Sequence, residues 1–197
     1  MGQIKVTACP IDGLFVIEPT VHNDERGDFF ESYNSRDMAE AGLNYEFVQD
    51  NQNYSTQGVL RGLHFQKQYP QAKLARVMVG SVFDVAVDLR KGSRTFGQWY
   101  GVELSAENHK QFLIPEGFAH GMLALSDNVV FVYKCTDFYH PGDEEGVAWN
   151  DPDIGISWPG VNGIYTGSAD ASTYQMDGCL LSLSEKDQRW HRLKDLY

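Results

Sequence analysis

The chain has 197 residues, 42% of them hydrophobic and 22% charged, which is enough to bury a substantial core as a single domain over residues 1–197. Its net charge of -11 argues against a nucleic-acid partner, although a few local cations can hold an anionic ligand in an acidic protein. The N-terminus lacks a basic segment followed by a long apolar one, and no stretch is apolar enough for a membrane helix, so we expect a cytoplasmic protein without a membrane partner.

Alternation of apolar and polar residues predicts a run of short strands with almost no helix between them. Residues 14–17 and 28–33 are predicted strands, and residues 35–42 are a predicted short helix with Ser35 as its N-cap. Residues 74–79 and 82–89 are predicted to form a hairpin. Further strands are predicted at residues 97–104, 110–114, 120–125 and 129–136.

This regular spacing of strands indicates an antiparallel sandwich or barrel. The chain changes character after residue 138, where residues 149–152 and 158–178 read as loops that wrap the surface. Residues 180–189 are expected to form a short terminal helix.

The segment RGLHFQ at residues 61–66 carries the first candidate for chemistry, His64. On a strand, period two places Leu60, Gly62, His64 and Gln66 on one face, and Gly62 leaves room beside the imidazole. A core histidine with satisfied hydrogen bonds is the alternative interpretation.

Lys73 shares its predicted face with Ala75 and Val77, where a lysine is costly unless it meets an anion or a developing negative charge. The alternative is a lysine at a strand end that reaches solvent. Asp84 and Asp88 alternate within an apolar strand, and each is either an interior partner for a cation or a solvated group.

Tyr133 lies in the apolar run VVFVYKC and is either a core aromatic or a phenol that delivers a proton. His120, between Gly117 and Gly121, is either structural or part of an anion site. A histidine, a lysine and a tyrosine on β-rich sequence together favour proton transfer.

A metal site is not expected, because metal-binding β-barrels of this kind use two histidines separated by one residue, and Gln66 stands where the second would be. The three cysteines have no CxxC spacing, so neither a thiolate zinc site nor a disulfide framework is predicted. No strand–GxGxxG–helix element is present either, so no nicotinamide cofactor is expected. A metal-dependent barrel enzyme remains an alternative.

Four segments are similar to one known family: RGLHFQ at 61–66, FDVAVDLR at 83–90, IPEGFAHG at 114–121 and WNDP at 149–152. They resemble the dTDP-4-dehydrorhamnose 3,5-epimerases (the RmlC family) of the cupin superfamily, over roughly residues 14–159 and again near 183–189. The resemblance implies an all-β antiparallel jelly-roll or cupin barrel with a few short helices. It also implies a cofactor-independent isomerase of dTDP-L-rhamnose biosynthesis, converting dTDP-4-dehydro-6-deoxy-D-glucose to dTDP-4-dehydro-L-rhamnose.

The same resemblance implies a role for each site residue. His64 would be the base with Asp187 behind it, Tyr133 the acid on the opposite face of the sugar, and Lys73 the cation beside the C4 oxygen. The further substrate contacts implied are Arg26, Phe29, Glu31, Gln49, Asn51, Arg61, His120, Tyr139, Glu144 and Lys186. The segment from Arg26 to Glu31 would reach into a partner subunit, so the N-terminal strands would be shared in a homodimer.

The chain departs from the family's pattern at residues 160–182, which look longer than the usual connection. This loop extension leaves the partner of His64 open between Asp187, Asp170 and Asp84. Two further alternatives are an epimerase that acts at C3 or C5 alone and a binding module without catalysis.

Overall fold

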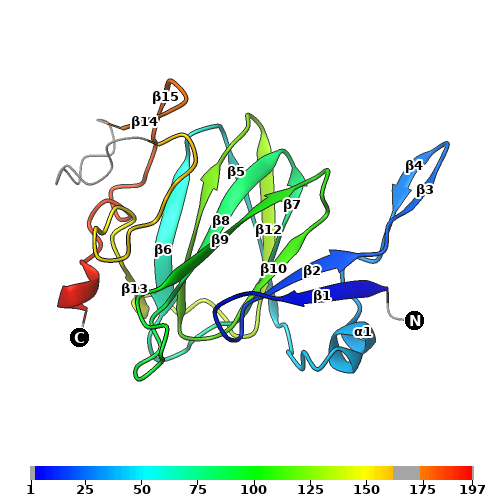
Figure 1. The fold of residues 1–197 in the computed structure, drawn as a ribbon, viewed down its shortest axis with the longest axis horizontal. Helices are drawn as coiled ribbons and strands as arrows, with labels where there is room; N and C mark the ends of the chain where they lie inside the picture. The colour runs from blue at the N-terminus through cyan, green and yellow to red at the C-terminus, as the bar shows by residue number, and fades with distance from the viewer. Residues whose placement is uncertain (1–2, 162–173, 197) are drawn as a thin grey trace.

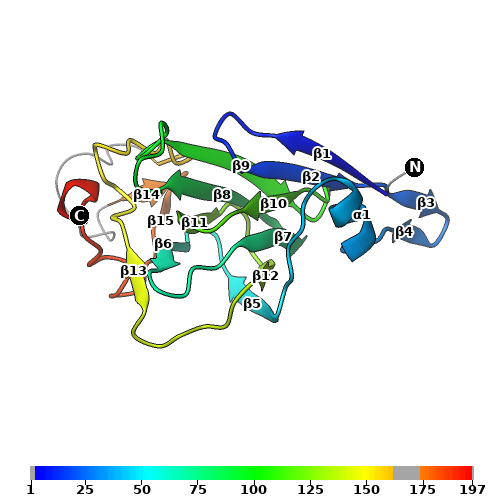
Figure 2. The same cartoon turned by 90° about the horizontal axis from the view of Figure 1, so that it is seen from below.

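The computed structural model describes residues 3–161 and 174–196, and its two large sheets contain only antiparallel strand pairs. The six-stranded sheet has the order β1 (Ile4–Ala8), β2 (Phe15–Pro19), β10 (Gln111–Ile114), β7 (Lys73–Val79), β12 (Val129–Cys135) and β5 (Gln49–Ser55). The five-stranded sheet has the order β13 (Glu144–Gly146), β6 (Leu60–Gln66), β11 (Phe118–Ala124), β8 (Ser81–Asp88) and β9 (Trp99–Ser105). The sheets face each other, as Figures 1 and 2 show, so the all-β antiparallel prediction is confirmed.

The remaining elements are short. Two small hairpins pair β3 (His22–Asp24) with β4 (Gly27–Phe29) and β14 (Gln175–Met176) with β15 (Cys179–Leu180). The helical segments of the described chain are α1 (Ser35–Glu40) and a 3₁₀ turn at Leu193–Asp195, so the predicted helix over 180–189 is wrong. Within the described ranges, no helix has the length and apolar character needed to cross a membrane.

The inner core fills the space between the two sheets. Phe112 and Phe131 come from the six-stranded sheet, and Val82 and Leu104 from the five-stranded sheet. Alternation along each strand produces this face, because side chains of period two point to one side.

A second core covers the outer face of the five-stranded sheet. Trp149, Trp158 and Tyr174 pack there with Val85 and Leu123. The prediction that the chain wraps the surface beyond residue 138 is therefore confirmed for its described part. The ends of the 160–182 extension take part through Val161, Met176 and Leu181.

Helix α1 packs Met38 against the outer face of the six-stranded sheet. Its N-cap is Asn34, whose side chain accepts hydrogen bonds from the backbone N–H groups of Arg36 and Asp37, so the prediction of Ser35 as the cap is wrong by one residue. Gly42, at a φ of +81°, ends the turn as expected.

The predicted hairpin of β7 and β8 is also wrong. Both strands exist, but β7 pairs with β10 and β12, whereas β8 pairs with β11 and β9. Gly80, at a φ of +77°, turns the chain from one sheet into the other, and a Cβ there would lie 2.5 Å from Ser126 Oγ. Lys73 thus belongs to one sheet and Asp84 to the other.

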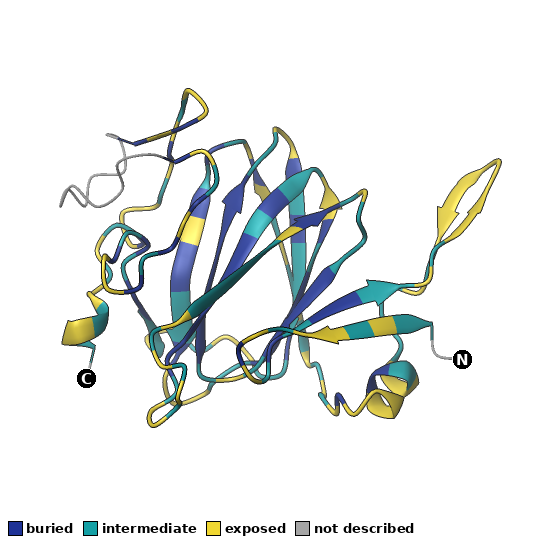
Figure 3. Ribbon diagram, viewed as in Figure 1, coloured by how far each residue is buried: buried dark blue, intermediate teal, exposed yellow. Residues whose placement is uncertain are grey.

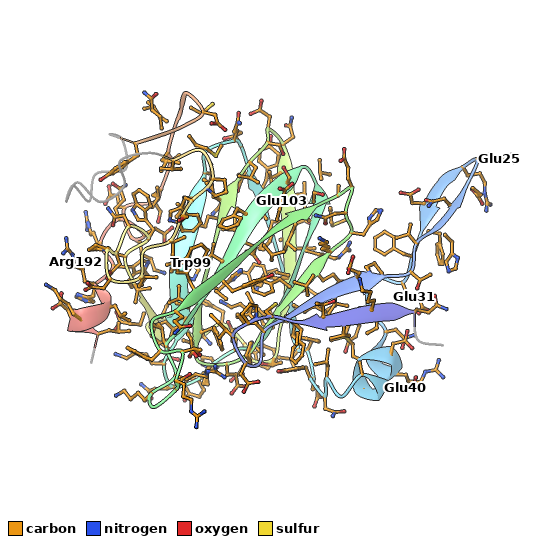
Figure 4. All side chains as sticks on the ribbon, in the orientation of Figure 1. Glu25, Glu31, Glu40, Trp99, Glu103 and Arg192 are labelled. Carbon is orange, nitrogen blue, oxygen red and sulfur yellow. The ribbon has the colours of Figure 1, made fainter. Side chains whose placement is uncertain are left out.

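The β3–β4 hairpin forms an arm that extends beyond the sheets, and every residue in its two strands is exposed (Figure 3). Glu25 lies at its tip and Glu31 near its base in Figure 4. A two-stranded hairpin without a buried face has little stability of its own.

Asp88 shows how the fold accommodates a buried charge. Its fully buried carboxylate accepts hydrogen bonds from Arg90 Nε and Nη2, Ser93 Oγ and Thr95 Oγ1 at 2.6–2.9 Å. Burial opposes ionisation, but these donors outweigh it and lower the pKa of Asp88 to about 2. Of the two interpretations of Asp88, the interior partner of a cation is the one observed.

Candidate active site

A pocket opens between the two sheets and is lined by side chains from both. His64 enters from β6 of the five-stranded sheet, and Lys73 and Tyr133 enter from β7 and β12 of the six-stranded sheet. The remaining lining residues are Gln49, Asn51, Phe65, Gln66, Gln71, Tyr139 and Glu144. The structure therefore brings together the three residues that the sequence singles out for proton transfer.

A bulge in β6 turns His64 inward. His64 pairs with His120 and Arg61 with Met122, so Gly62 and Leu63 together oppose a single residue of β11. Leu60 and Leu63 pack in the outer core, whereas His64 lines the pocket on the other face. The prediction that Leu60 and His64 share a face is wrong, because the bulge shifts the period-two alternation by one residue.

Gly62 has a different function from the one predicted. It lies at a φ of +103°, and a Cβ on it would be 2.5 Å from the carbonyl oxygen of His120. The absent side chain makes room for the backbone of β11, not for a ligand. Gly121, on β11, is restricted in the same way, because a Cβ on it would lie 2.6 Å from the carbonyl oxygen of Arg61.

The imidazole of His64 is held as a neutral base. Burial, with the nearby positive charge of Lys73, lowers the pKa of His64 well below its usual 6.5. Its Nδ1 lies 3.4 Å from Glu144 Oε1. An unprotonated ring at neutral pH, with a carboxylate facing one nitrogen, can accept a proton at the other.

Glu144, on β13, connects the base to the rim of the pocket. One of its oxygens faces His64, and the other forms an ion pair with Lys186 and accepts a 3.5 Å hydrogen bond from the Tyr139 hydroxyl. The resemblance places Glu144 among the nucleotide contacts. Because Glu144 also lies beside His64, its carboxylate can orient the imidazole as well.

Asp187 lies behind the strand that carries the base. Its buried carboxylate accepts a hydrogen bond from Trp190 Nε1 at 3.3 Å and one from the backbone N–H of Gly62. Burial raises the pKa of Asp187 above its usual value. In the described part of the chain the carboxylate paired with His64 is that of Glu144, so the pairing of His64 with Asp187 stays a prediction.

The two fallback partners for His64 are placed differently. Asp170 lies outside the described residues. Asp84 is fully buried and pairs with His120, whose Nε2 is 2.8 Å from Asp84 Oδ1. The second oxygen of Asp84 has no hydrogen-bond partner among the described residues. Asp84 is therefore an interior partner for a histidine, and the solvated interpretation of this residue is wrong.

Lys73 begins β7 and is only 7% exposed, so the interpretation as a lysine reaching solvent is wrong. Burial lowers the pKa of Lys73 below its usual value, while the carboxylates of Glu144 and Asp84 act in the opposite direction. The described chain shows no hydrogen bond or ion pair of the Lys73 ammonium with another side chain, which leaves this group to meet an oxygen in the pocket.

Tyr133 faces the pocket from the sheet opposite His64. Burial raises the pKa of its hydroxyl to about 12, with a further contribution from Glu144. The phenol therefore keeps its proton at neutral pH. Its ring meets that of His120 edge-on at a centroid distance of 6.2 Å.

The other predicted contacts fall into two groups. Gln49, Asn51 and Tyr139 line the pocket, and the guanidinium of Arg61 is bonded to Ser55 Oγ and the carbonyl oxygen of Tyr54. By contrast, Arg26, Phe29 and Glu31 belong to the arm and its base, and none of them lines the pocket of this chain.

Sequence reasoning missed Phe65, Gln66 and Gln71 as lining residues. Gln66 could have been found from the sequence, because it is a polar residue two positions after His64 on the same strand. Its amide is occupied by backbone groups and is not free to act as a ligand. Among residues 3–161 and 174–196, no three His, Cys, Asp or Glu side chains gather as potential metal ligands.

Comparison with known proteins supplies the family. The family model described as dTDP-4-dehydrorhamnose 3,5-epimerase matches residues 8–195. A dTDP-4-dehydrorhamnose 3,5-epimerase from Methanothermobacter thermautotrophicus is 50% identical over 195 residues, covering 99% of this chain and 97% of that protein.

Solved structures agree in fold. The dTDP-6-deoxy-D-glucose-3,5-epimerase from Legionella pneumophila, in complex with dTDP-4-keto-L-rhamnose, has a TM-score of 0.87 and 45% identity and covers 98% of this chain and 95% of that chain. A 3'-monoepimerase from Streptomyces bikiniensis, in complex with dTDP-quinovose, has a TM-score of 0.80 and 32% identity over 94% of this chain and 86% of that chain. With its site geometry and its match over almost its full length, the chain belongs to the dTDP-4-dehydrorhamnose 3,5-epimerase family.

Proposed function

We propose that this protein epimerises dTDP-4-dehydro-6-deoxy-D-glucose at C3 and C5 to give dTDP-4-dehydro-L-rhamnose, without a cofactor, in dTDP-L-rhamnose biosynthesis. One observation carries the proposal: a neutral histidine and a protonated tyrosine face one pocket from opposite sheets, with a buried lysine beside them. The dTDP-sugar bound to the related Legionella pneumophila enzyme supports the substrate class.

The first step is removal of a proton from the carbon next to the C4 ketone. With Glu144 facing Nδ1, the Nε2 lone pair of His64 is the group left to take this proton. The C–H electron pair becomes the enolate, whose negative charge develops on the C4 oxygen. The ammonium of Lys73 stabilises that oxygen, and loss of such a contact typically costs about 10²–10³ in rate.

Inversion requires that the proton returns from the other face of the sugar. Tyr133, on the sheet opposite His64, donates its phenolic proton to carbon, which restores the ketone and leaves a phenolate. Solvent then reprotonates the phenolate and takes up the proton held by His64. The same cycle at the second carbon completes the double epimerisation. Asp187, behind β6, supports the base through the strand that carries it.

Substrate binding in an acidic protein needs local cations. Arg61, His120 and Lys186 each lie close enough to His64 to affect its pKa, and they are the groups proposed to hold the diphosphate. Gln49, Asn51 and Tyr139 line the pocket and are proposed to contact the nucleotide.

A second candidate function is epimerisation at one carbon only. The similarity to a 3'-monoepimerase at 32% identity supports this second candidate, because a protein of the same fold carries out epimerisation at one carbon. Sugar orientation in the pocket decides between the two reactions.

The direct test follows substrate protons by NMR in D₂O. The wild-type protein is expected to remove both the H3 and the H5 signal of dTDP-4-dehydro-6-deoxy-D-glucose, while His64→Ala removes neither. Gln68→Ala, in an exposed loop residue near the pocket, is the matched control and should behave as wild type. Loss of one signal would establish the single-carbon reaction, and retention of both by the wild type would refute enolisation.

Tyr133→Phe separates proton removal from inversion. This variant keeps the aromatic ring but has no proton to deliver, so we expect deuterium to enter from the His64 side while inverted product falls by about 10²–10⁴. The measurement compares deuterium content with product configuration in the same sample. Inversion at the wild-type rate would exclude Tyr133 as the acid.

The β3–β4 arm supports a homodimer in which each chain contributes to the partner's pocket. Phe29 is 70% exposed on this arm, and the ion pair of Arg26 is with Asp24 on the same arm. We expect sedimentation at about twice the chain mass of 22.2 kDa, and weaker dTDP binding by Phe29→Ser. The mass of a single chain, with unchanged binding by this variant, would contradict the shared site.

A further inference from the structure

The segment of residues 137–140 leaves β12 without entering any strand or helix. It carries two large exposed aromatic side chains, Phe138 at 57% and Tyr139 at 52% exposure, and Tyr139 lines the pocket. An irregular segment with exposed side chains is usually mobile, because few buried contacts hold it. The rim of the pocket therefore needs some other restraint if Tyr139 is to meet a ligand in one position.

Three glutamine side chains provide that restraint, and they hold four consecutive residues by their backbone. Gln71 Nε2 donates to the carbonyl oxygen of residue 137 at 2.7 Å, and Gln49 Oε1 accepts the N–H of Tyr139 at 2.9 Å. Gln66 makes two of the contacts: its Nε2 donates to the carbonyl oxygen of residue 138 at 3.1 Å, and its Oε1 accepts the N–H of residue 140 at 2.7 Å.

Gln66 is the centre of this arrangement. It is only 5% exposed, and its Nε2 also donates to the carbonyl oxygen of Tyr69 at 2.7 Å. The ring of Tyr69 stacks on that of His140 with centroids 3.9 Å apart, which adds a ring contact between the loop after β6 and the segment after β12. A buried amide with both donors and its acceptor engaged has one favourable orientation.

The three glutamines come from different places around the pocket. Gln66 ends β6, two residues after His64, Gln49 begins β5, and Gln71 lies two residues before Lys73. The position of Tyr139 is thus fixed relative to both the base and the cation of the site. The strand pairing of β12 ends at Cys135, so the sheet itself does not hold residues 137–140. The three amide side chains hold these residues instead.

We propose that Gln49, Gln66 and Gln71 form a clamp that preorganises the aromatic rim, so that Tyr139 meets the flat ring of the nucleotide without first being ordered. The clamp rests on the proposed function, because it assigns the rim to the nucleotide end of that substrate. Gln66 and Gln71 are positioning residues that act through Tyr139 and take no part in proton transfer. Preorganised contacts strengthen binding by reducing the entropy lost when the ligand binds.

The test uses Gln71→Ala and Gln66→Met, which remove the hydrogen bonds, with Gln68→Ala as the matched control. Gln68 lies on the same loop with an exposed side chain. We expect the two clamp variants to raise the Kd of dTDP, measured by calorimetry, and the KM of the dTDP-sugar by about tenfold, with kcat changed by less than about twofold. A fall in kcat with unchanged KM would overturn the positioning role.

A double-mutant cycle separates the clamp from general stabilisation. Because the clamp acts through Tyr139, Gln71→Ala should weaken dTDP binding in the wild-type background and have no further effect in Tyr139→Ala. Equal effects in both backgrounds would show that Gln71 acts elsewhere and would overturn the proposal.

The two proposals fail in different ways. If the wild-type protein binds dTDP and the clamp variants weaken it, but no sugar proton exchanges with D₂O, the epimerase function falls and the clamp stands. If protons exchange while the clamp variants bind dTDP as the wild type does, the clamp falls alone. A wild-type protein that does not bind dTDP overturns both.

Discussion

The close approach of β6 and β11 is the constraint on which the site depends. Gly62 and Gly121 bring the two backbones within distances that no Cβ would allow, and the resulting bulge reverses the direction in which β6 presents its side chains. Without this phase shift, His64 would face the outer core with Leu60. A residue with a side chain at either glycine would separate the strands and displace the base from Lys73 and Tyr133.

Once His64 is inside, the pocket determines its protonation state. Burial disfavours an imidazolium, and the positive charge of Lys73 adds to this effect. The same burial keeps the proton on Tyr133. One environment therefore leaves the histidine able to accept a proton and the tyrosine with a proton to donate, which is the pair of groups that the proposed inversion at carbon requires. The buried ammonium of Lys73 lowers the pKa of His64, and it is also the group proposed to stabilise the enolate oxygen.

Sequence patterns were sufficient to predict a strand where the local alternation or apolar run agrees with the tertiary structure. The strands around residues 97–136 were predicted to within about two residues because short apolar runs stand there between turn-forming residues, even in β10 and β11, where every residue is buried. The β7–β8 hairpin failed because Gly80 provides a tight turn whether the following strand pairs with its predecessor or crosses to the other sheet. The β6 face failed because a bulge leaves no mark in the order of apolar residues. His64, Lys73 and Tyr133 were recognisable as unusual residues on apolar strands, whereas the glutamines of the clamp contact backbone groups far along the chain, which periodicity does not encode.

The central claim, that His64 is neutral in the resting protein, is tested most directly by following its ring nitrogens by ¹⁵N NMR as a function of pH, with His64→Ala used for assignment. A group whose pKa in the folded state is lowered stays unprotonated until the pH falls below its usual value. The account predicts that the His64 signals show a neutral ring at pH 6.5 and titrate well below it. A midpoint at or above 6.5 would contradict the account, because the pocket would then not favour the neutral ring over the imidazolium.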